Sequence, residues 1–400
     1  MPKILRITNR LNIGGPTYNV AYLTKYLAPE FDTLLLTGMR DTKEGSSEHI
    51  LQQFDLSARI IPHMQREVSP YNDFLAYREI RKVIREFKPD IVHTHMSKPG
   101  ATGRMAAIHE HVPVILHTFH GHVFHSYFSP MKTKFFQKVE QYLASKTTGI
   151  IAISDLQKKE LTEEFNICHP DKAHTIRLGF DLSRFQESMP EKRTRFREEW
   201  KIQTDEIAIG IIGRLVPVKN HRFFLDAIRQ VLTVCPDKKV KVFIVGDGEL
   251  RSSLESYCRE LQLAYDTENE ISGNHPVVFT SWILQADEVV AGMDIIALSS
   301  FNEGTPVSLI EAQAAGVPIV TTDAGGIRDV VKENETALIA EQGDMAQFSN
   351  HLVRLIREDE LRKMMAQKGP EHAITHFHYR SLVENMRQLY RKLLDSRNYR

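Results

Sequence analysis

The stretch DIIALSSFNEGTPVSLIEAQAAGVPIVTTDAGG, residues 294–326, decides how the rest of the chain is interpreted. An apolar strand over 294–299 enters a loop, a helix begins near Thr305 and ends at Gly316, and a second apolar strand covers 317–321. Strand, helix and strand within about thirty residues predict a parallel βαβ unit. Because parallel sheets bind ligands at the carboxyl ends of their strands, we expect chemistry in the loop 301–305.

That loop combines two carboxylates with free backbone amides. Glu303 lies in the loop, Glu311 lies in the helix, and Gly304 and Thr305 leave N–H groups at the helix N-terminus. Such amides at the positive end of a helix dipole suit a phosphate. A carboxylate farther along the helix suits the two hydroxyls of a ribose. The spacing alone also fits two solvated glutamates, so the remaining motifs have to decide.

Composition narrows the class of protein. The chain has 400 residues, 42% hydrophobic and 26% charged, with 51 basic and 51 acidic residues. We therefore expect a globular enzyme of two domains and no nucleic-acid binding driven by overall charge. Three isolated cysteines, an N-terminus that begins directly with a strand and no long apolar run predict a cytoplasmic protein. Contact with a membrane would be peripheral, at its cytoplasmic face.

The N-terminal half offers a glycine pair and a group of histidines. Gly14 and Gly15 follow the first strand, where missing Cβ atoms let the backbone approach a ligand. The segment 113–128 contains four histidines, and we expect His120, just beyond a strand, to contact a sugar hydroxyl or a departing group. A zinc site is the alternative, but no carboxylate or cysteine accompanies the histidines, so we predict no metal. His122 and His125 are candidates for an acceptor pocket.

The predicted helix over 130–146 has two readings. Its apolar residues pack in a core beneath a solvated lysine face, or they face anionic lipid. The second reading would suit a lipid-linked acceptor.

The C-terminal half supplies cations at strand ends. Arg214 follows the buried strand 207–212 and Lys219 begins the next helix, so the two could grip a diphosphate. Gly246 and Gly248 form the exit turn of the following strand, and Trp282 is a candidate wall for a nucleobase. The charged segment 177–205 shows no strand pattern and marks the domain boundary.

Together these motifs resemble the retaining glycosyltransferases of family four over nearly the full length. The resemblance rests on a series of strand-end motifs in the family's order: Gly14-Gly15, His120 after Thr118 and Phe119, Gly213-Arg214 with Lys219-Asn220, Gly246-Asp247-Gly248, and Glu303 with Glu311. It implies an α/β protein of GT-B architecture, with two Rossmann-like domains whose parallel sheets face across a cleft. We place the acceptor-binding domain at 1–185, the nucleotide-sugar-binding domain at 186–375, and a returning helix at 376–400.

The resemblance also implies roles for single residues. Arg214 and Lys219 would meet the donor diphosphate, Glu311 would hold the ribose, and Glu303 and His120 would lie by the donor sugar. We thus expect His120, Glu303, Arg214 and Lys219 to be catalytic. We expect a second set to bind donor: Gly14, Gly15, Arg214, Lys219, Gly246, Gly248, Trp282, Gly304, Thr305 and Glu311.

The implied activity is hexosyl transfer from a nucleotide-diphosphate sugar, with UDP expected as the nucleotide, to a glycan or lipid-linked acceptor of polysaccharide or cell-envelope biosynthesis. The nucleotide-sugar is a substrate, and no cofactor or divalent metal is expected. The alternatives are a sugar-nucleotide 2-epimerase of the same fold and a non-catalytic nucleotide-sugar-binding protein.

Overall fold

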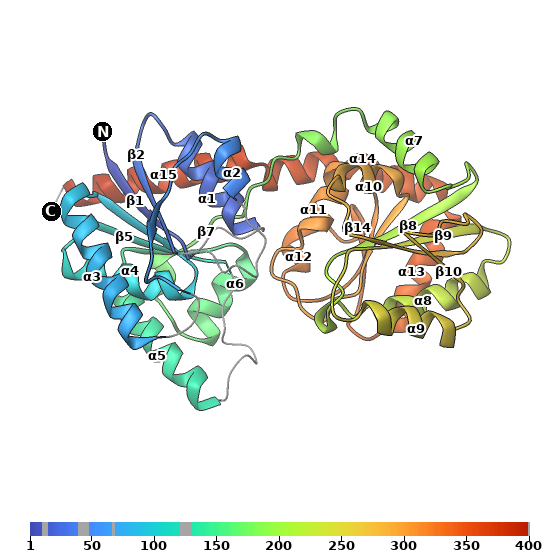
Figure 1. Ribbon diagram of the computed structural model, residues 1–400, viewed down its shortest axis with the longest axis horizontal. Coiled ribbons are helices and arrows are strands. Elements are labelled where there is room, and N and C mark those ends of the chain that lie inside the picture. Colours follow the sequence, from blue (N-terminus) through green and yellow to red (C-terminus); the bar gives the residue numbers. More distant parts are fainter. Residues whose placement is uncertain (10–14, 39–47, 66–68, 121–129, 399–400) are drawn as a thin grey trace. The chain divides into compact units, whose positions relative to one another are not determined.

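Two sheets, each with its own hydrophobic core, organise the chain. The computed structural model describes residues 1–9, 15–38, 48–65, 69–120 and 130–398 (Figure 1). One unit consists of Met1–Phe180 together with Phe377–Arg400, and the other of Asp181–His376. The sequence placed the divisions after residues 185 and 375, whereas the structure divides the chain after Phe180 and His376.

Within the described residues, the first unit has seven parallel strands in the order β3-β2-β1-β4-β5-β6-β7. Their bounds are β1 Lys3–Ile7, β2 Asp32–Gly38, β3 Arg59–Ile61, β4 Ile91–His95, β5 Val114–Phe119, β6 Gly149–Ala152 and β7 Ala173–Thr175. The chain reverses its direction of travel across the sheet between β1 and β4, so the carboxyl ends of these strands form a topological switch point.

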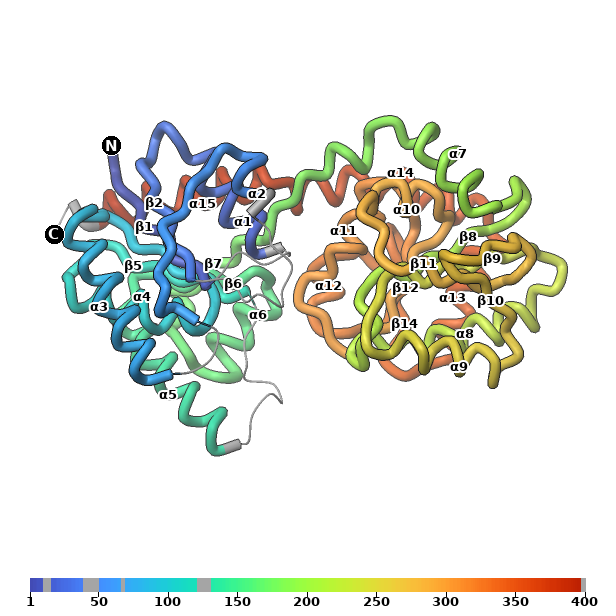
Figure 2. Tube along the Cα trace, viewed as in Figure 1, coloured from blue at the N-terminus to red at the C-terminus, as the bar shows by residue number. Residues whose placement is uncertain are grey.

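Helices cover both faces of this sheet. Two of them, α1 (Gly15–Tyr26) and α15 (Tyr379–Asn398), share one core with β1, β4, β5 and β6. On the other face, α3 (Pro70–Phe87) and α4 (Ser97–His109) bury β1, β2 and β4. The unit also contains α2 Glu48–Gln53, α5 Pro130–Lys146 and α6 Asp155–Lys159. Figure 2 shows the N-terminus and the C-terminal helix within this same unit.

The second unit repeats this architecture. Its described residues form seven parallel strands in the order β10-β11-β9-β8-β12-β13-β14. The strands are β8 Glu206–Ile212, β9 Lys239–Val245, β10 Tyr265–Thr267, β11 Val277–Ser281, β12 Ile295–Leu298, β13 Ile319–Thr322 and β14 Ala337–Ala340. The helices are α7 Met189–Glu199, α8 His221–Val234, α9 Arg251–Glu260, α10 Ala286–Gly292, α11 Val307–Ala314, α12 Ile327–Val330, α13 Met345–Arg357 and α14 Asp359–Phe377. The switch point lies between β8 and β12.

The parallel sheets explain the apolar runs in the sequence. Strands β8 and β9 are flanked by strands on both sides and by helices on both faces, so the residues in their middle are buried whichever way they point. The charged segment 177–205 has no strand, as expected, but it contains α7, which packs on α10. Phe196 of α7 lies so close to Gly292 that a Cβ there would be 2.2 Å from its ring.

Candidate active site

Glu303 and Lys219 meet at the switch point of the second unit. Glu303 lies in the loop after β12, and Lys219 ends a 3₁₀ turn, Pro217–Lys219, after β8. The Lys219 Nζ donates to Glu303 Oε1 at 2.6 Å, and the Ser300 hydroxyl donates to the same oxygen at 2.5 Å. The side chains of Glu303 and Lys219 are 9% and 22% exposed, so this ion pair is largely shielded from water. The two residues that the sequence assigned to the donor sugar and diphosphate therefore share one site.

The backbone holds the Glu303 loop against two neighbouring loops. The Phe301 amide donates to Val218 O at 2.8 Å, and the Gly326 amide after β13 donates to Glu303 O at 2.8 Å. Gly325 has φ +58°, and a Cβ there would lie 2.2 Å from Glu303 O. A Cβ at Gly326 would lie 2.0 Å from Gly304 O. Both glycines are thus required for the loops to touch, a role that the sequence analysis did not assign to them.

Gly246 and Gly248 serve a similar packing purpose after β9. Gly246 has φ +132°, and a Cβ there would lie 2.1 Å from Gly213 O. A Cβ at Gly248 would lie 2.5 Å from Leu215 O. These contacts press the β9 exit loop onto the loop that carries Arg214. The predicted contact of Gly246 and Gly248 with a donor stays a prediction. The close packing of the two loops already requires glycine at both positions, whether or not a donor binds there.

Three other predicted residues present open surface near these loops. Arg214 is exposed immediately beyond β8. Trp282 follows β11 and is 56% exposed. A Cβ added to Gly304 would meet no atom within 4 Å, so the space above this residue is free. Thr305 is partly buried, and α11 begins two residues after it rather than at Thr305 itself.

Glu311 lies on α11 and pairs with a residue that the sequence analysis missed. Its Oε1 is 3.7 Å from the Arg184 Nη2, and its side chain is 15% exposed. Burial raises the pKa of Glu311 to about 7, the Arg184 charge opposes that rise, and Asp287 adds to it. Arg184 stacks its guanidinium 4.9 Å from the centre of the Phe185 ring. An arginine in a charged segment gave no sequence signal for this pairing.

His120 in the first unit closes a row of buried histidines. Its Nε2 lies 3.0 Å from Nδ1 of His95, which ends β4. Burial lowers the pKa of His120 to about 4, so the ring is neutral near pH 7. Gly15 begins α1, whereas Gly14, His122 and His125 lie outside the described residues. His117 is fully buried, and its Nδ1 lies 2.9 Å from the Thr94 hydroxyl.

Comparison with protein families covers both units. The family model described as Glycosyltransferase Family 4 matches residues 13–184, and the model described as Glycosyl transferases group 1 matches residues 192–372. The chain belongs to the family-four glycosyltransferases.

Relatives of this glycosyltransferase share most of its length. It is 27% identical over 336 residues to the UDP-Gal:alpha-D-GlcNAc-diphosphoundecaprenol alpha-1,3-galactosyltransferase of Escherichia coli, covering 83% of each chain. It is 24% identical to the capsular polysaccharide biosynthesis glycosyltransferase CapM of Staphylococcus aureus, covering 86% of this chain and 87% of CapM. The crystal structure of Anabaena HepE in complex with UDP superposes with a TM-score of 0.81 at 19% identity, over 98% of this chain and 100% of HepE. The fold is thus GT-B, as predicted.

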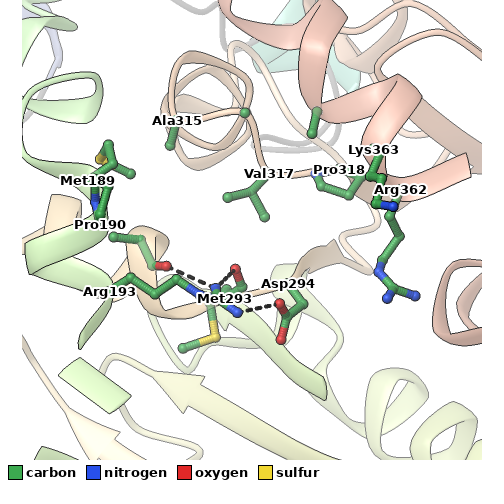
Figure 3. Close-up of a pocket in the computed structure, with 13 residues that line it drawn as sticks. Met189, Pro190, Arg193, Met293, Asp294, Ala315, Val317, Pro318, Arg362 and Lys363 are labelled. Atoms are coloured by element: carbon green, nitrogen blue, oxygen red, sulfur yellow. Dashed lines mark hydrogen bonds and ion pairs between the residues drawn. The ribbon is translucent and has the colours of Figure 1, made fainter. Parts of the chain in front are cut away.

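A hollow of about 410 Å³ in the glycosyltransferase lies away from these loops (Figure 3). It sits at the amino ends of β12 and β13, between Met189, Arg193, Asp294 and Val317. The Arg193 guanidinium is already bonded to Asp294 Oδ1 at 2.6 Å and to Met293 O at 3.0 Å. Because parallel sheets bind ligands at their carboxyl ends, the loops and not this hollow are the candidate active site.

The described part of the chain offers neither a metal site nor a membrane-spanning helix. It contains no group of three or more His, Cys, Asp or Glu side chains placed to hold a metal ion. None of its helices combines the length and the apolar character that crossing a membrane requires.

Proposed function

We propose that this glycosyltransferase transfers a hexose, with retention of anomeric configuration and without a metal ion, from a UDP-sugar to a glycan or lipid-linked acceptor of polysaccharide or cell-envelope biosynthesis. The observation that carries the proposal is the Lys219–Glu303 pair at the switch point, beside the open backbone of Gly304. The names of relatives support the substrates: the Escherichia coli enzyme takes UDP-Gal and a diphosphoundecaprenol acceptor, and HepE was crystallised with UDP.

The charges of the second unit suit departure of a diphosphate. Breaking the sugar–phosphate bond leaves negative charge on the diphosphate and positive charge on the anomeric carbon. Lys219 and the exposed Arg214 are positive groups that would stabilise the diphosphate, and the amides before α11 add the positive end of a helix. The carboxylate of Glu303 lies beside Lys219, where it would favour the positive anomeric carbon.

The remaining roles follow from position. Glu311, once ionised, would accept hydrogen bonds from the ribose hydroxyls, and Trp282 offers an exposed ring to the uracil base. The neutral ring of His120 would donate a hydrogen bond to the donor sugar. In a front-side reaction the departing phosphate takes the proton of the acceptor hydroxyl, so the enzyme needs no separate base for that step.

Purified enzyme with a panel of UDP-sugars and a polyprenyl-diphosphate-linked acceptor tests this proposal. We expect a new glycoside whose anomeric configuration, read by NMR, matches that of the donor. Lys219→Ala should weaken UDP binding roughly 10- to 100-fold, because it removes a charge-assisted hydrogen bond. Lys239→Ala is the matched control, since Lys239 opens β9 at the opposite end of the sheet and pairs with Asp205. Inversion, or a 2-epimerised donor without transfer, would contradict the proposal.

We further propose that α5 rests on the cytoplasmic face of an anionic membrane. Three large apolar side chains on this helix, Met131, Phe135 and Tyr142, are 83%, 64% and 60% exposed instead of packed in the core. Lysines 132, 134, 138 and 146 are exposed on the same helix, whereas its one acidic residue, Glu140, is buried against Arg104 at 2.6 Å. Exposed apolar groups flanked by cations are typical of interfacial helices.

Vesicle sedimentation tests the membrane proposal. The protein should bind vesicles that contain phosphatidylglycerol and lose most of this binding with Met131→Ser and Phe135→Ser together. Met364→Ser, an exposed methionine on α14, is the control. Equal binding to neutral and anionic vesicles, or binding unaffected by the α5 changes, would count against a role for α5.

A further inference from the structure

A line of buried polar side chains crosses the first unit at its switch point. Arg6 on β1 and His95 on β4 are 0% and 1% exposed. The Arg6 Nη1 lies 3.4 Å from His95 Nε2, and His95 Nδ1 lies 3.0 Å from His120 Nε2. Because β1, β4 and β5 are neighbours in the sheet, these three side chains form one continuous chain of contacts.

Arg6 sets which partner donates and which accepts in the Arg6–His95–His120 series. A guanidinium only donates hydrogen bonds, so His95 Nε2 has to accept. Burial lowers the pKa of His95 well below its usual range, and His95 is therefore neutral and carries its proton on Nδ1. That proton is donated to His120 Nε2. His120, which is neutral as well, then carries its own proton on Nδ1.

The same Arg6 nitrogen, Nη1, has two further neighbours. It lies 3.3 Å from the Tyr390 hydroxyl of α15 and 3.2 Å from His93 Nδ1. The Tyr390 hydroxyl donates its proton to His93 Nδ1 at 2.6 Å, so the two Nη1 protons of Arg6 are left for the Tyr390 oxygen and for His95 Nε2. With Nδ1 accepting, His93 carries its proton on Nε2 and donates it to the Thr118 hydroxyl at 2.8 Å. The two histidines of β4 therefore take opposite tautomers around one guanidinium.

We propose that Arg6 and His95 are positioning residues that lock His120 in the tautomer with its proton on Nδ1. His120 then meets the sugar substrate as a hydrogen-bond donor through Nδ1, a role that rests on the proposed function. Its Nδ1 is buried and has no hydrogen-bond partner among the described residues, so the protein itself offers no acceptor for the proton on this nitrogen. A carboxylate in place of Arg6 would reverse the whole chain and leave His120 Nδ1 as an acceptor.

The tautomers can be read without any assay of activity. Long-range ¹H–¹⁵N spectra of the enzyme labelled at histidine ring nitrogens distinguish the two neutral forms, and His→Asn variants assign the signals. We expect protons on Nδ1 of His95 and His120 and on Nε2 of His93. In Arg6→Met the His95 and His120 signals should indicate a mixture of the two tautomers. Arg6→Lys keeps a cationic donor at this position and should keep the wild-type tautomers. A proton on Nε2 of His120 in the wild type would overturn the proposal.

The catalytic consequence is tested by a matched pair of variants. In His95→Asn the side-chain amide nitrogen takes the place of Nδ1 and can still donate to His120, whereas in His95→Gln the amide lies at the place of Nε2. We expect His95→Gln to lower kcat about tenfold with a smaller change in KM, and His95→Asn to stay within about threefold of wild type. Urea unfolding followed by circular dichroism checks that both variants fold.

The outcomes separate the two proposals. If both variants lose activity and stability alike, Arg6 and His95 are merely structural and the positioning role fails. If the wild type transfers no sugar from any donor, the proposed function fails, but the tautomer spectra still decide whether the chain of protons exists.

Discussion

Replacing Glu311 with glutamine should stabilise the second unit while weakening donor binding. Burial raises the pKa of this carboxyl from 4.5 to about 7. Ionising Glu311 at about pH 8 therefore costs the folded unit about 3 kcal/mol more than it costs the unfolded chain. At about pH 5 the group is protonated when folded, and the cost falls to about 1 kcal/mol.

The pH dependence of stability follows from the number of protons that the folded and unfolded states bind. Between pH 4.5 and about 7 the folded unit holds a proton that the unfolded chain has lost, so the stability of the wild-type unit falls as pH rises through this window. Glutamine has nearly the same shape and cannot ionise. The free energy of unfolding of the second unit should therefore be higher in Glu311→Gln than in the wild type, by about 3 kcal/mol at about pH 8 and by about 1 kcal/mol at about pH 5.

Tryptophan fluorescence isolates this effect. The chain has two tryptophans, and both Trp200 and Trp282 belong to the second unit. Urea unfolding read by this signal thus reports that unit alone. Glu260→Gln, an exposed glutamate on α9, is the control and should change stability little at either pH. A Glu311→Gln variant that is no more stable than wild type at about pH 8, or equally shifted at both pH values, would refute the reasoning.

Three further predictions concern the loops and the charge beside them. Arg184→Gln removes the charge that opposes the raised pKa of Glu311, so the pH at the midpoint of the UDP-affinity profile should increase. An unchanged midpoint would show that Arg184 does not influence the ionisation of Glu311. Gly325→Ala should destabilise the second unit by about 1–3 kcal/mol in urea, because its φ is +58° and its Cβ would lie 2.2 Å from Glu303 O. Gly304→Ala should leave stability within about 0.5 kcal/mol yet weaken UDP binding measured by calorimetry, and full binding would show that the donor does not approach there.

Local patterns were enough to locate the central strands and the loop that carries Glu303. Branched apolar runs gave the central strands, and the βαβ rhythm placed Glu303 at a carboxyl end. The short edge strands β7, β10 and β14 were not predicted, because three or four residues carry little periodicity and the strand forms through pairing with its neighbour.

The partners of the site residues could not be predicted, because they come from distant parts of the chain. Arg6 is a single charged residue inside an otherwise apolar stretch, and its contact Tyr390 lies near the other end of the sequence. Glycines posed a different difficulty, since the sequence pattern is the same whether a glycine admits a ligand or another loop. A Cβ at Gly246 would lie 2.1 Å from the carbonyl oxygen of Gly213, whereas a Cβ at Gly304 would meet no atom within 4 Å. Only the three-dimensional structure distinguishes these two cases.

If the proposed function is right, the Lys219–Glu303 pair makes the donor site preorganised. A lone lysine on a loop keeps its rotamer freedom, and ordering it when a ligand binds costs up to about 2 kcal/mol. Here the ammonium is already fixed by a carboxylate at 2.6 Å, which is itself fixed by Ser300. An ammonium has three donors, so it can keep this bond and still turn another toward a phosphate oxygen. The same carboxylate would repel the phosphate if the lysine were absent. Under the proposed function, Glu303 would therefore restrict a diphosphate to the side of Lys219 that faces away from the carboxylate. This restriction would orient the attached sugar before any bond breaks.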